Sequence, residues 1–180
     1  MAARDRELSS GAHAECLVTA EIQPADIARI KALYDDLYLK KYSFHNPQFN
    51  QHFFAEALCK RWLTFRVLRR QGRIDGVLGF VERNGVMTTP LIGYDRSVDA
   101  AAGLYRLISL ELVEQAAARG LILHQSSGAA AFKRHRGSVA SMEYNLIYDR
   151  HLAPRRRLPW QLLEALSRAV IVPLMRRYEL

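Results

Sequence analysis

The fold of this chain is decided by two runs of sequence, LTFRVLRRQGRIDGVLGFVERNGVMTTPLIGY at residues 63–94 and AAAGLYRLISLELVEQAAARGLILHQ at residues 100–125. The first run holds three β-rich segments, at residues 63–69, 77–82 and 86–94. Gln71-Gly72 and Asn84-Gly85 stand between them, and Asn-Gly tolerates the positive φ angles of a tight hairpin turn. The first run therefore predicts a meander of three antiparallel strands.

The second run predicts a helix followed by a strand. The helix covers about residues 100–119 and stops at Gly120, because glycine readily takes the left-handed conformation at a helix C-terminus. The short apolar segment 121–125 has the composition of a fully buried strand. Since a helical crossover joins parallel strands, we expect this segment to lie parallel to the strand at 86–94.

Further elements flank this centre. We expect a first strand at residues 16–22, a loop at residues 40–47, and a last strand that begins at Glu143 and Tyr144. Helices are expected to start at Gln23-Pro24, at Asn50, at the basic segment after residue 128, and at Pro159. This order predicts the α/β (α+β) class, with a mixed central sheet flanked by helices.

The chain has the length of one globular domain. Residues 1–14 are expected to form a flexible N-terminus, because they are small and polar. Residues 15–152 would form the main domain, and residues 153–180 a C-terminal helical extension packed on that domain. No apolar run approaches the roughly 18 residues that cross a membrane.

The cysteine content and the net charge indicate the cellular compartment and the kind of partner. Cys16 and Cys59 are too few for a disulfide framework, which suggests a reducing cytoplasm. The net charge is +8, and residues 119–180 hold 11 Lys and Arg against 4 Asp and Glu. Such a basic segment attracts anionic partners, although a solvated charged face explains it equally well.

The segment after the buried strand carries the sharpest motif. It consists of Ser127-Gly128, Phe132-Lys133-Arg134 and Gly137. Together with Leu33-Tyr34 and Asn46-Pro47 upstream, this motif resembles the GNAT acyltransferase superfamily, closest to its FemAB and CelD-type proteins. The resemblance covers most of residues 17–150 and implies a groove that opens between the two parallel strands.

The resemblance also implies a donor and an acceptor. The donor would be acetyl-CoA or another acyl-CoA, or an aminoacyl group as in FemAB-type proteins, and the acceptor would be an amine. The residues expected to contact this anionic donor are Ile92, Gly93, Tyr94, Arg96, Ser97, Ser126, Ser127, Gly128, Lys133 and Arg134.

The donor loop departs from the pattern of the superfamily. Typical members bind the CoA pyrophosphate with a Q/R-x-x-G-x-G/A loop, whose backbone N–H groups point at the phosphates. Here the loop reads Arg96-Ser97-Val98-Asp99-Ala100-Ala101, and Asp99 stands where the first glycine belongs. A carboxylate repels phosphate, so Asp99 is better explained as the N-cap of the following helix.

Three residues are candidates for proton transfer. His124 ends the buried strand and could act as the general base, because its ordinary pKa lies near neutrality. Glu143 and Tyr144 begin the next strand, and the resemblance implies that Tyr144 could protonate the leaving thiolate. Each could equally be a packing residue. The scattered histidines lack ligand spacing, so no metal site is expected.

Two functions remain open from the sequence. The chain is an N-acyltransferase, or it is a non-catalytic module of the same fold that binds a ligand or partner through its basic C-terminal third. A homodimer is worth testing because FemAB-type proteins contain two such units. A tRNA partner is the weaker expectation.

Overall fold

The computed structural model describes residues 5–7, 15–18 and 21–178. Most of the expected flexible N-terminus, residues 1–4 and 8–14, lies outside the described residues. The chain divides into two compact units, Met1–Ala129 and Ala130–Leu180. The division falls before residue 152, the end of the main domain expected from the sequence.

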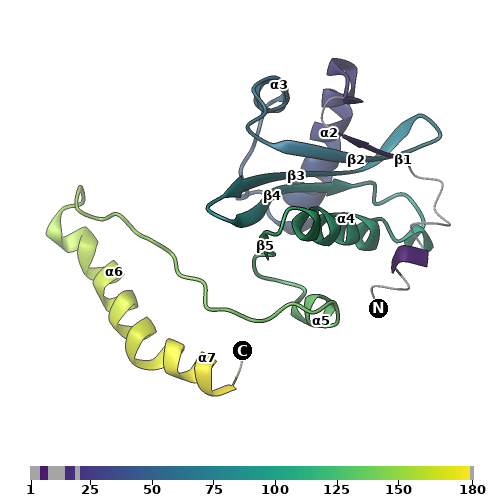
Figure 1. Cartoon of the computed structure of the whole chain (residues 1–180). Coiled ribbons are helices and arrows are strands. Elements are labelled where there is room, and N and C mark those ends of the chain that lie inside the picture. Colours follow the sequence, from purple (N-terminus) through teal and green to yellow (C-terminus); the bar gives the residue numbers. More distant parts are fainter. Residues whose placement is uncertain (1–4, 8–14, 19–20, 179–180) are drawn as a thin grey trace. The chain divides into compact units, whose positions relative to one another are not determined.

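The N-terminal unit is built on a five-stranded sheet with the strand order β1-β2-β3-β4-β5 (Figure 1). The strands are β1 (Glu15–Val18), β2 (Thr64–Arg70), β3 (Arg73–Arg83), β4 (Val86–Tyr94) and β5 (Ile122–His124). Strands β1 to β4 pair antiparallel, and β5 pairs parallel to β4. The predicted meander and the predicted parallel crossover are therefore confirmed.

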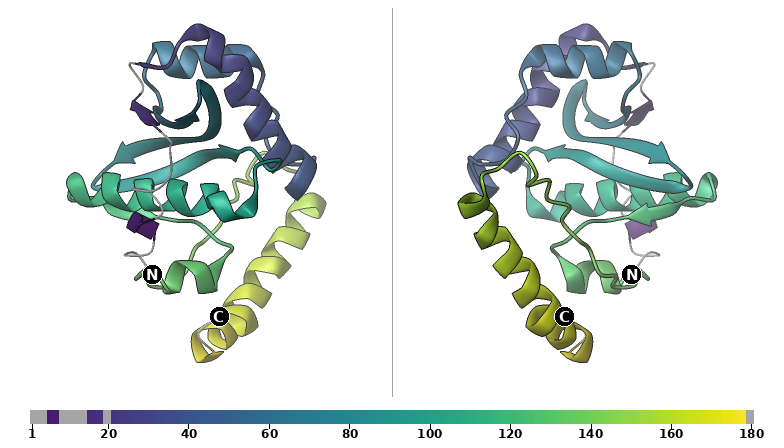
Figure 2. Two further views of the ribbon diagram at one scale, coloured as in Figure 1. Left: turned by 90° about the vertical axis from the view of Figure 1, so that its right-hand side faces the viewer. Right: turned by 90° about the vertical axis from the view of Figure 1, so that its left-hand side faces the viewer.

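Helices cover both faces of this sheet (Figure 2). They are α2 (Ile27–Tyr34), which continues as the π-helix η3 (Asp35–Tyr42), α3 (Gln51–Cys59) and α4 (Leu104–Ala118). Residues of α2 and α3 pack with Val77 on one face, while residues of α4 pack with Leu78 on the other. Neighbouring residues of β3 thus enter opposite cores, because side chains alternate along a strand.

The helix α2 approaches the sheet most closely at Gly93. A Cβ atom on Gly93 would lie 2.8 Å from the backbone carbon of Leu33 and 2.9 Å from the nitrogen of Tyr34. Only glycine fits there without moving the helix. This contact fixes where η3, the continuation of α2, passes the end of β4.

The sequence misplaced the ends of two helices. The helix expected to end before residue 40 runs on to Tyr42 as η3, so part of the expected loop is helical. The helix α4 begins at Leu104 rather than near residue 100, because Gly103 (φ 62°) breaks it from the 3-10 turn η4 (Ala100–Ala102). At its other end Gly120 has a φ of 62°, in agreement with the predicted stop.

The expectation that β5 is fully buried is wrong. It is an edge strand with only β4 beside it among the described residues, and Ile122 is 71% exposed. The last strand expected from Glu143 is also absent, because residues 138–149 adopt no regular structure. A strand needs a neighbour for its backbone hydrogen bonds, and β-rich composition does not supply one.

The C-terminal unit is helical. It contains α5 (Ala130–Arg134), α6 (Pro154–Leu166), the π-helical segment η5 (Ser167–Ile171) and α7 (Val172–Tyr178). The helix α6 starts earlier than the expected Pro159, because Pro154 stands at its first position, where no backbone N–H is needed. No described helix is long and apolar enough to cross a membrane.

Candidate functional site

The sheet opens where β4 runs past the end of β5. The last paired residues are Thr88 and His124, whereas β4 continues to Tyr94. The register between β3 and β4 shifts at this point, since Gly79 pairs with Leu91 but Val81 pairs with Thr88. One extra residue in β4 therefore forms a bulge.

The bulge changes which backbone groups of β4 face the opening. The Asp95 N–H donates to the Asp75 carbonyl across β3, at 2.8 Å. Because these groups alternate along a strand, the N–H groups of Ile92 and Tyr94 point away from β3 and toward the opening. Pro90, which has no N–H, stands at the bulge itself, where an unpaired strand edge tolerates it.

Tyr38 lies at this opening. Its hydroxyl lies beside the backbone N–H of Ile92, which favours the ionised form of the side chain and so lowers its pKa. Its ring stacks on Tyr34, with centroids 4.6 Å apart, and meets the Tyr42 ring edge-on at 6.1 Å. The site is therefore built by η3 together with the unpaired edge of β4, and π-helical turns often mark functional sites.

The Tyr38 hydroxyl is held in its protonated form. Burial raises the pKa of Tyr38, the nearby Tyr42 raises it further, and the N–H of Ile92 opposes the shift. At neutral pH the side chain can give a proton to a developing anion.

Basic side chains gather at the end of β4. The Lys41 ammonium donates to the Tyr94 hydroxyl at 3.2 Å. Asp36 forms ion pairs with Lys40 and with Arg96, each at 3.6 Å. Lys40 and Arg96 thus share one carboxylate and Lys41 adds a third cation, which leaves a net positive charge at the end of the open edge.

The loop after β4 has most of its N–H groups occupied. Asp95 accepts from the backbone N–H and the hydroxyl of Ser97, and Asp99 accepts from the N–H of Ala101 at 2.7 Å. Turn carbonyls take the next N–H groups, those of Ala102 and Gly103. The expected N-cap role of Asp99 is confirmed, and the usual backbone cradle for a pyrophosphate does not fit this loop.

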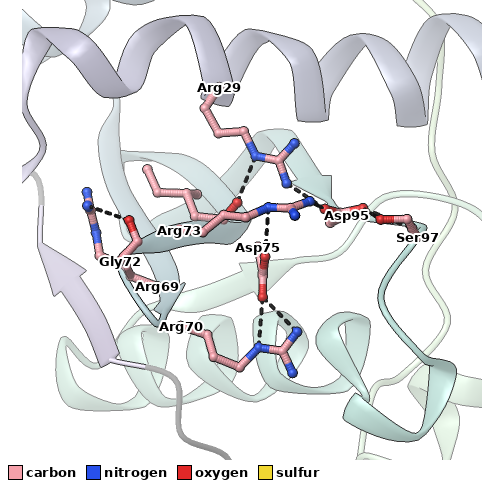
Figure 3. Close-up of polar contacts among 9 residues, drawn as sticks. Arg29, Arg69, Arg70, Gly72, Arg73, Asp75, Asp95 and Ser97 are labelled. Carbon is pink, nitrogen blue, oxygen red and sulfur yellow. Dashed lines mark hydrogen bonds and ion pairs between the residues drawn. The ribbon is translucent and has the colours of Figure 1, made fainter.

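An arginine–aspartate network holds this loop in place (Figure 3). Asp95 is bound by Arg29 at 2.6 Å and by Arg73, and Arg73 also reaches Asp75 at 3.6 Å. Arg70 binds Asp75 at 2.9 Å from the side of α4. Both carboxylates are buried, so their charge is balanced by guanidinium groups on α2, β2 and β3.

The residues predicted for the site fall into three groups. Ile92, Gly93 and Tyr94 lie together on the open edge of β4, with Arg96 and Ser97 in the next loop. His124 is exposed and ends β5, about 20 Å along the strand direction from Tyr94, at about 3.3 Å per residue. Tyr94 and His124 are therefore not neighbours.

The remaining predicted residues follow β5. Ser126, Ser127 and Gly128 form an exposed turn in which Ser126 has a φ of 57°. Lys133 and Arg134 end α5 in the C-terminal unit, and Glu143 and Tyr144 lie in its irregular stretch. Burial lowers the pKa of Lys133, and the charge of Glu143 opposes that shift.

Sequence reasoning missed Tyr38 and Lys41. Tyr38 belongs to the apolar helical pattern, and Lys41 lies in the stretch 40–47 that was expected to be a loop. A continued helical spacing from Tyr34 to Tyr38 and Tyr42 was the available signal. Among the described residues no group of three or more His, Cys, Asp or Glu side chains could hold a metal ion.

Comparisons with known proteins agree with this architecture. One solved structure is a predicted acetyltransferase with acetyl-CoA from Clostridium acetobutylicum (TM-score 0.56, 10% identity, 76% of this chain and 96% of that chain). Another is a Trypanosoma brucei acetyltransferase (TM-score 0.54, 20% identity, 75% and 99%). A third is L-PGS from Bacillus licheniformis (TM-score 0.54, 14% identity, 76% and 50%). At these identities the likeness shows the fold.

The sequence comparisons give the family. No curated protein matches the chain. The family model described as Acetyltransferase (GNAT) domain matches residues 2–134, which is well over half of the sequence. The chain belongs to the GNAT acetyltransferase domain family.

Proposed function

We propose that this protein is an N-acyltransferase that moves an acyl group from a CoA thioester to an amine, at the open edge of β4. The observation that carries the proposal is the half-buried Tyr38 hydroxyl, which lies beside the backbone N–H of Ile92 where β5 no longer pairs with β4. Acyl transfer at family level supports the reaction class, and the acetyl-CoA bound by the neighbour from Clostridium acetobutylicum supports the donor.

The donor would lie along β4. Its amide-containing pantetheine arm can hydrogen-bond to backbone groups of the unpaired edge, in the manner of an added strand. Its phosphates would be held by the side chains of Lys40, Lys41 and Arg96, because Asp95 and Asp99 occupy the N–H groups of the loop. Side-chain recognition of this kind distinguishes the chain from relatives with a glycine-rich loop.

The reaction needs one proton removed and one proton supplied. The amine nitrogen attacks the thioester carbonyl carbon, the C–S bond breaks, and the thiolate of CoA takes a proton. Tyr38 is placed to donate that proton or to stabilise the charge that develops on the carbonyl oxygen. His124 stands at the mouth of the opening, about 13 Å from Ile92 along the strand, and is the proposed acceptor of the proton from the amine.

The test compares variants at the opening. Turnover would be measured with acetyl-CoA and longer acyl-CoAs against a panel of amines, by release of free thiol. Tyr38→Phe keeps the ring and loses only the hydroxyl, so we expect turnover to fall about 100-fold or more. Tyr42→Phe, on the exposed end of η3, is the matched control and should change turnover less than about threefold.

A second donor separates proton transfer from packing. An aryl thioester releases a more acidic thiol that needs no proton, so Tyr38→Phe should be much less impaired with this donor than with acetyl-CoA. An equal loss with both donors would rule out proton donation from Tyr38 to the thiolate. His124→Gln should cut turnover by about 10²–10⁴-fold with either donor, and a loss of only a few-fold removes it as the base.

The occupied N–H groups of the donor loop favour a second candidate, a non-catalytic GNAT module that binds an anionic ligand. Ligand binding to the native state raises the unfolding temperature. A rise with CoA but no thiol release from any acyl-CoA would support this module over the enzyme. The reducing cytoplasm expected for either function is consistent with Cys59, a free and exposed thiol.

A further inference from the structure

The C-terminal helix carries an exposed apolar face. From Pro154 to Tyr178 the chain is helical without interruption, through α6, η5 and α7 (Figure 1). Nine of its large apolar side chains are between 40% and 62% exposed, and they are Leu158, Trp160, Leu162, Leu163, Leu166, Val170, Ile171, Leu174 and Tyr178. A folded protein rarely leaves so many large apolar residues on one element without a partner.

These residues are arranged as an amphipathic helix. Leu158, Leu162 and Leu166 recur every four residues and share one face of α6. Arg157, Gln161, Glu164 and Arg168 follow the spacing of the opposite face. The middle of the helix therefore offers an apolar stripe on one side and a polar side on the other.

The helix is also strongly cationic. Between residues 154 and 178 it holds six arginines against one acidic residue, Glu164. Three of them, Arg155, Arg156 and Arg157, stand in the first turn, where the helix dipole disfavours positive charge and where no acidic residue or side-chain cap offsets it. Arg157 donates to the carbonyls of Leu152 and Arg150. Arg155 and Arg156 weaken the isolated helix at this position, so they are better explained by an external anion.

We propose that α6 and α7 lie on the surface of an anionic phospholipid bilayer. The apolar stripe would enter the boundary of the acyl chains, and the arginines would contact the phosphate headgroups, with Trp160 and Tyr178 at the interface. The proposal is independent of the acyltransferase activity. It places the protein on a membrane surface without a spanning helix.

The charge and the apolar stripe together favour a membrane over other partners. In a dimer formed through this helix, the six arginines of each copy would lie near those of the other, and the repulsion between these like charges opposes self-association. RNA would satisfy the arginines but would leave the leucine stripe in water. Only an anionic bilayer matches both faces.

The experiment uses the full chain and its own fluorescence. The protein has two tryptophans, so Trp62→Phe leaves Trp160 as the sole reporter. Phosphatidylcholine vesicles with and without phosphatidylglycerol would be titrated into this variant. We expect a blue shift of Trp160 and co-sedimentation with the anionic vesicles only, and weaker binding as salt is added.

Matched variants test each face. Arg155→Gln, Arg156→Gln and Arg168→Gln together should weaken vesicle binding on the order of 100-fold, since each arginine near an anionic surface contributes about a factor of five. Leu162→Ala with Leu166→Ala should weaken it about tenfold or more while keeping helix propensity. Gln161→Ala with Ser167→Ala, which spare the leucine stripe, should bind as the parent does.

The outcomes separate the proposal from its rivals. No blue shift with anionic vesicles, or equal binding to neutral ones, overturns it. The proposal is also overturned if light scattering shows a dimer and the Trp160 emission is already blue-shifted without vesicles. A second copy would then cover the apolar stripe. The proposal also fails if a homopolymeric RNA binds the protein and the leucine variants keep the parent's affinity for both the RNA and the vesicles. The helix would then be a polyanion-binding surface.

Discussion

Replacing Gly93 by alanine should destabilise the protein through a single backbone contact. The added methyl group would lie 2.8 Å from the Leu33 carbonyl carbon and 2.9 Å from the Tyr34 nitrogen. Both atoms belong to the backbone of α2, so the methyl group is accommodated only if the helix moves from the sheet by several tenths of an ångström. The helix carries η3, so Tyr38 should move away from Ile92 with it.

The expected loss follows from two opposing contributions. Overpacking of a core costs about 1–3 kcal/mol. Alanine also restricts the unfolded chain, which returns about 0.4–1 kcal/mol where glycine has an ordinary φ. We therefore expect Gly93→Ala to lower the free energy of unfolding by about 1–2 kcal/mol. For a protein of this size the unfolding temperature should fall by about 2–8 °C.

Urea unfolding followed by far-ultraviolet circular dichroism measures this loss. At a slope of about 2 kcal/mol per molar urea, the midpoint should fall by about 0.5–1 M. Gly76→Ala is the control, because a Cβ on Gly76 meets only the methyl ends of Ile108 and Leu68, at 3.2 Å each, which can rotate away. Equal midpoints for the two variants, or a wild-type midpoint for Gly93→Ala, would refute the reasoning.

Three further predictions concern charge and titration. Asp99→Gly removes a carboxylate and frees an N–H group, so CoA should bind more tightly by isothermal calorimetry, at a cost of a few tenths of a kcal/mol in stability. Asp95→Asn leaves Arg29 and Arg73 without their shared carboxylate, so the free energy of unfolding from chemical denaturation should fall by about 2 kcal/mol. An unchanged midpoint would mean that the network is dispensable. Burial raises the pKa of Tyr34 to about 12, so its neutral form is favoured in the folded state. Stability should thus be insensitive to this group below about pH 10 and should fall between pH 10 and 12, and Tyr34→Phe should flatten that fall.

Turn chemistry made the meander predictable. Asn84 and Gly85 have φ angles of 52° and 77°, as a tight hairpin requires, and Gly120 ends α4 at a φ of 62°. These conformations depend on the residues themselves, with little influence from distant parts of the chain. The antiparallel strands and the parallel crossover followed from them.

The strands at the end of the chain could not be predicted in this way. The segment from Glu143 has the composition of a strand, yet it adopts no regular structure, and Tyr144 is exposed. Similarly, the apolar residues of β5 predicted a buried strand, but β5 lies at the sheet edge. Whether a β-rich segment pairs depends on which neighbour reaches it, and this is a property of the whole fold.

Some residues of the candidate site were predictable from the sequence, and others required the folded structure. The residues of β4 were identified from the resemblance to GNAT proteins, and the capping role of Asp99 followed from local chemistry. The contribution of Tyr38 was not predictable, because the sequence separates it from Ile92 by the whole of α3, β2 and β3. Their meeting requires the bulge of β4 and the close approach of α2 at Gly93.

The turns, the strand order of the meander, the helix stop at Gly120 and the basic character of the C-terminal helix could all be predicted from local sequence. Each of these depends on interactions within a few residues. The position of Tyr38 at the open edge of β4, and that of β5 at the edge of the sheet, followed only from the folded structure. Such contacts depend on register and helix packing, because a shift of one residue turns a side chain or an N–H group to the other side.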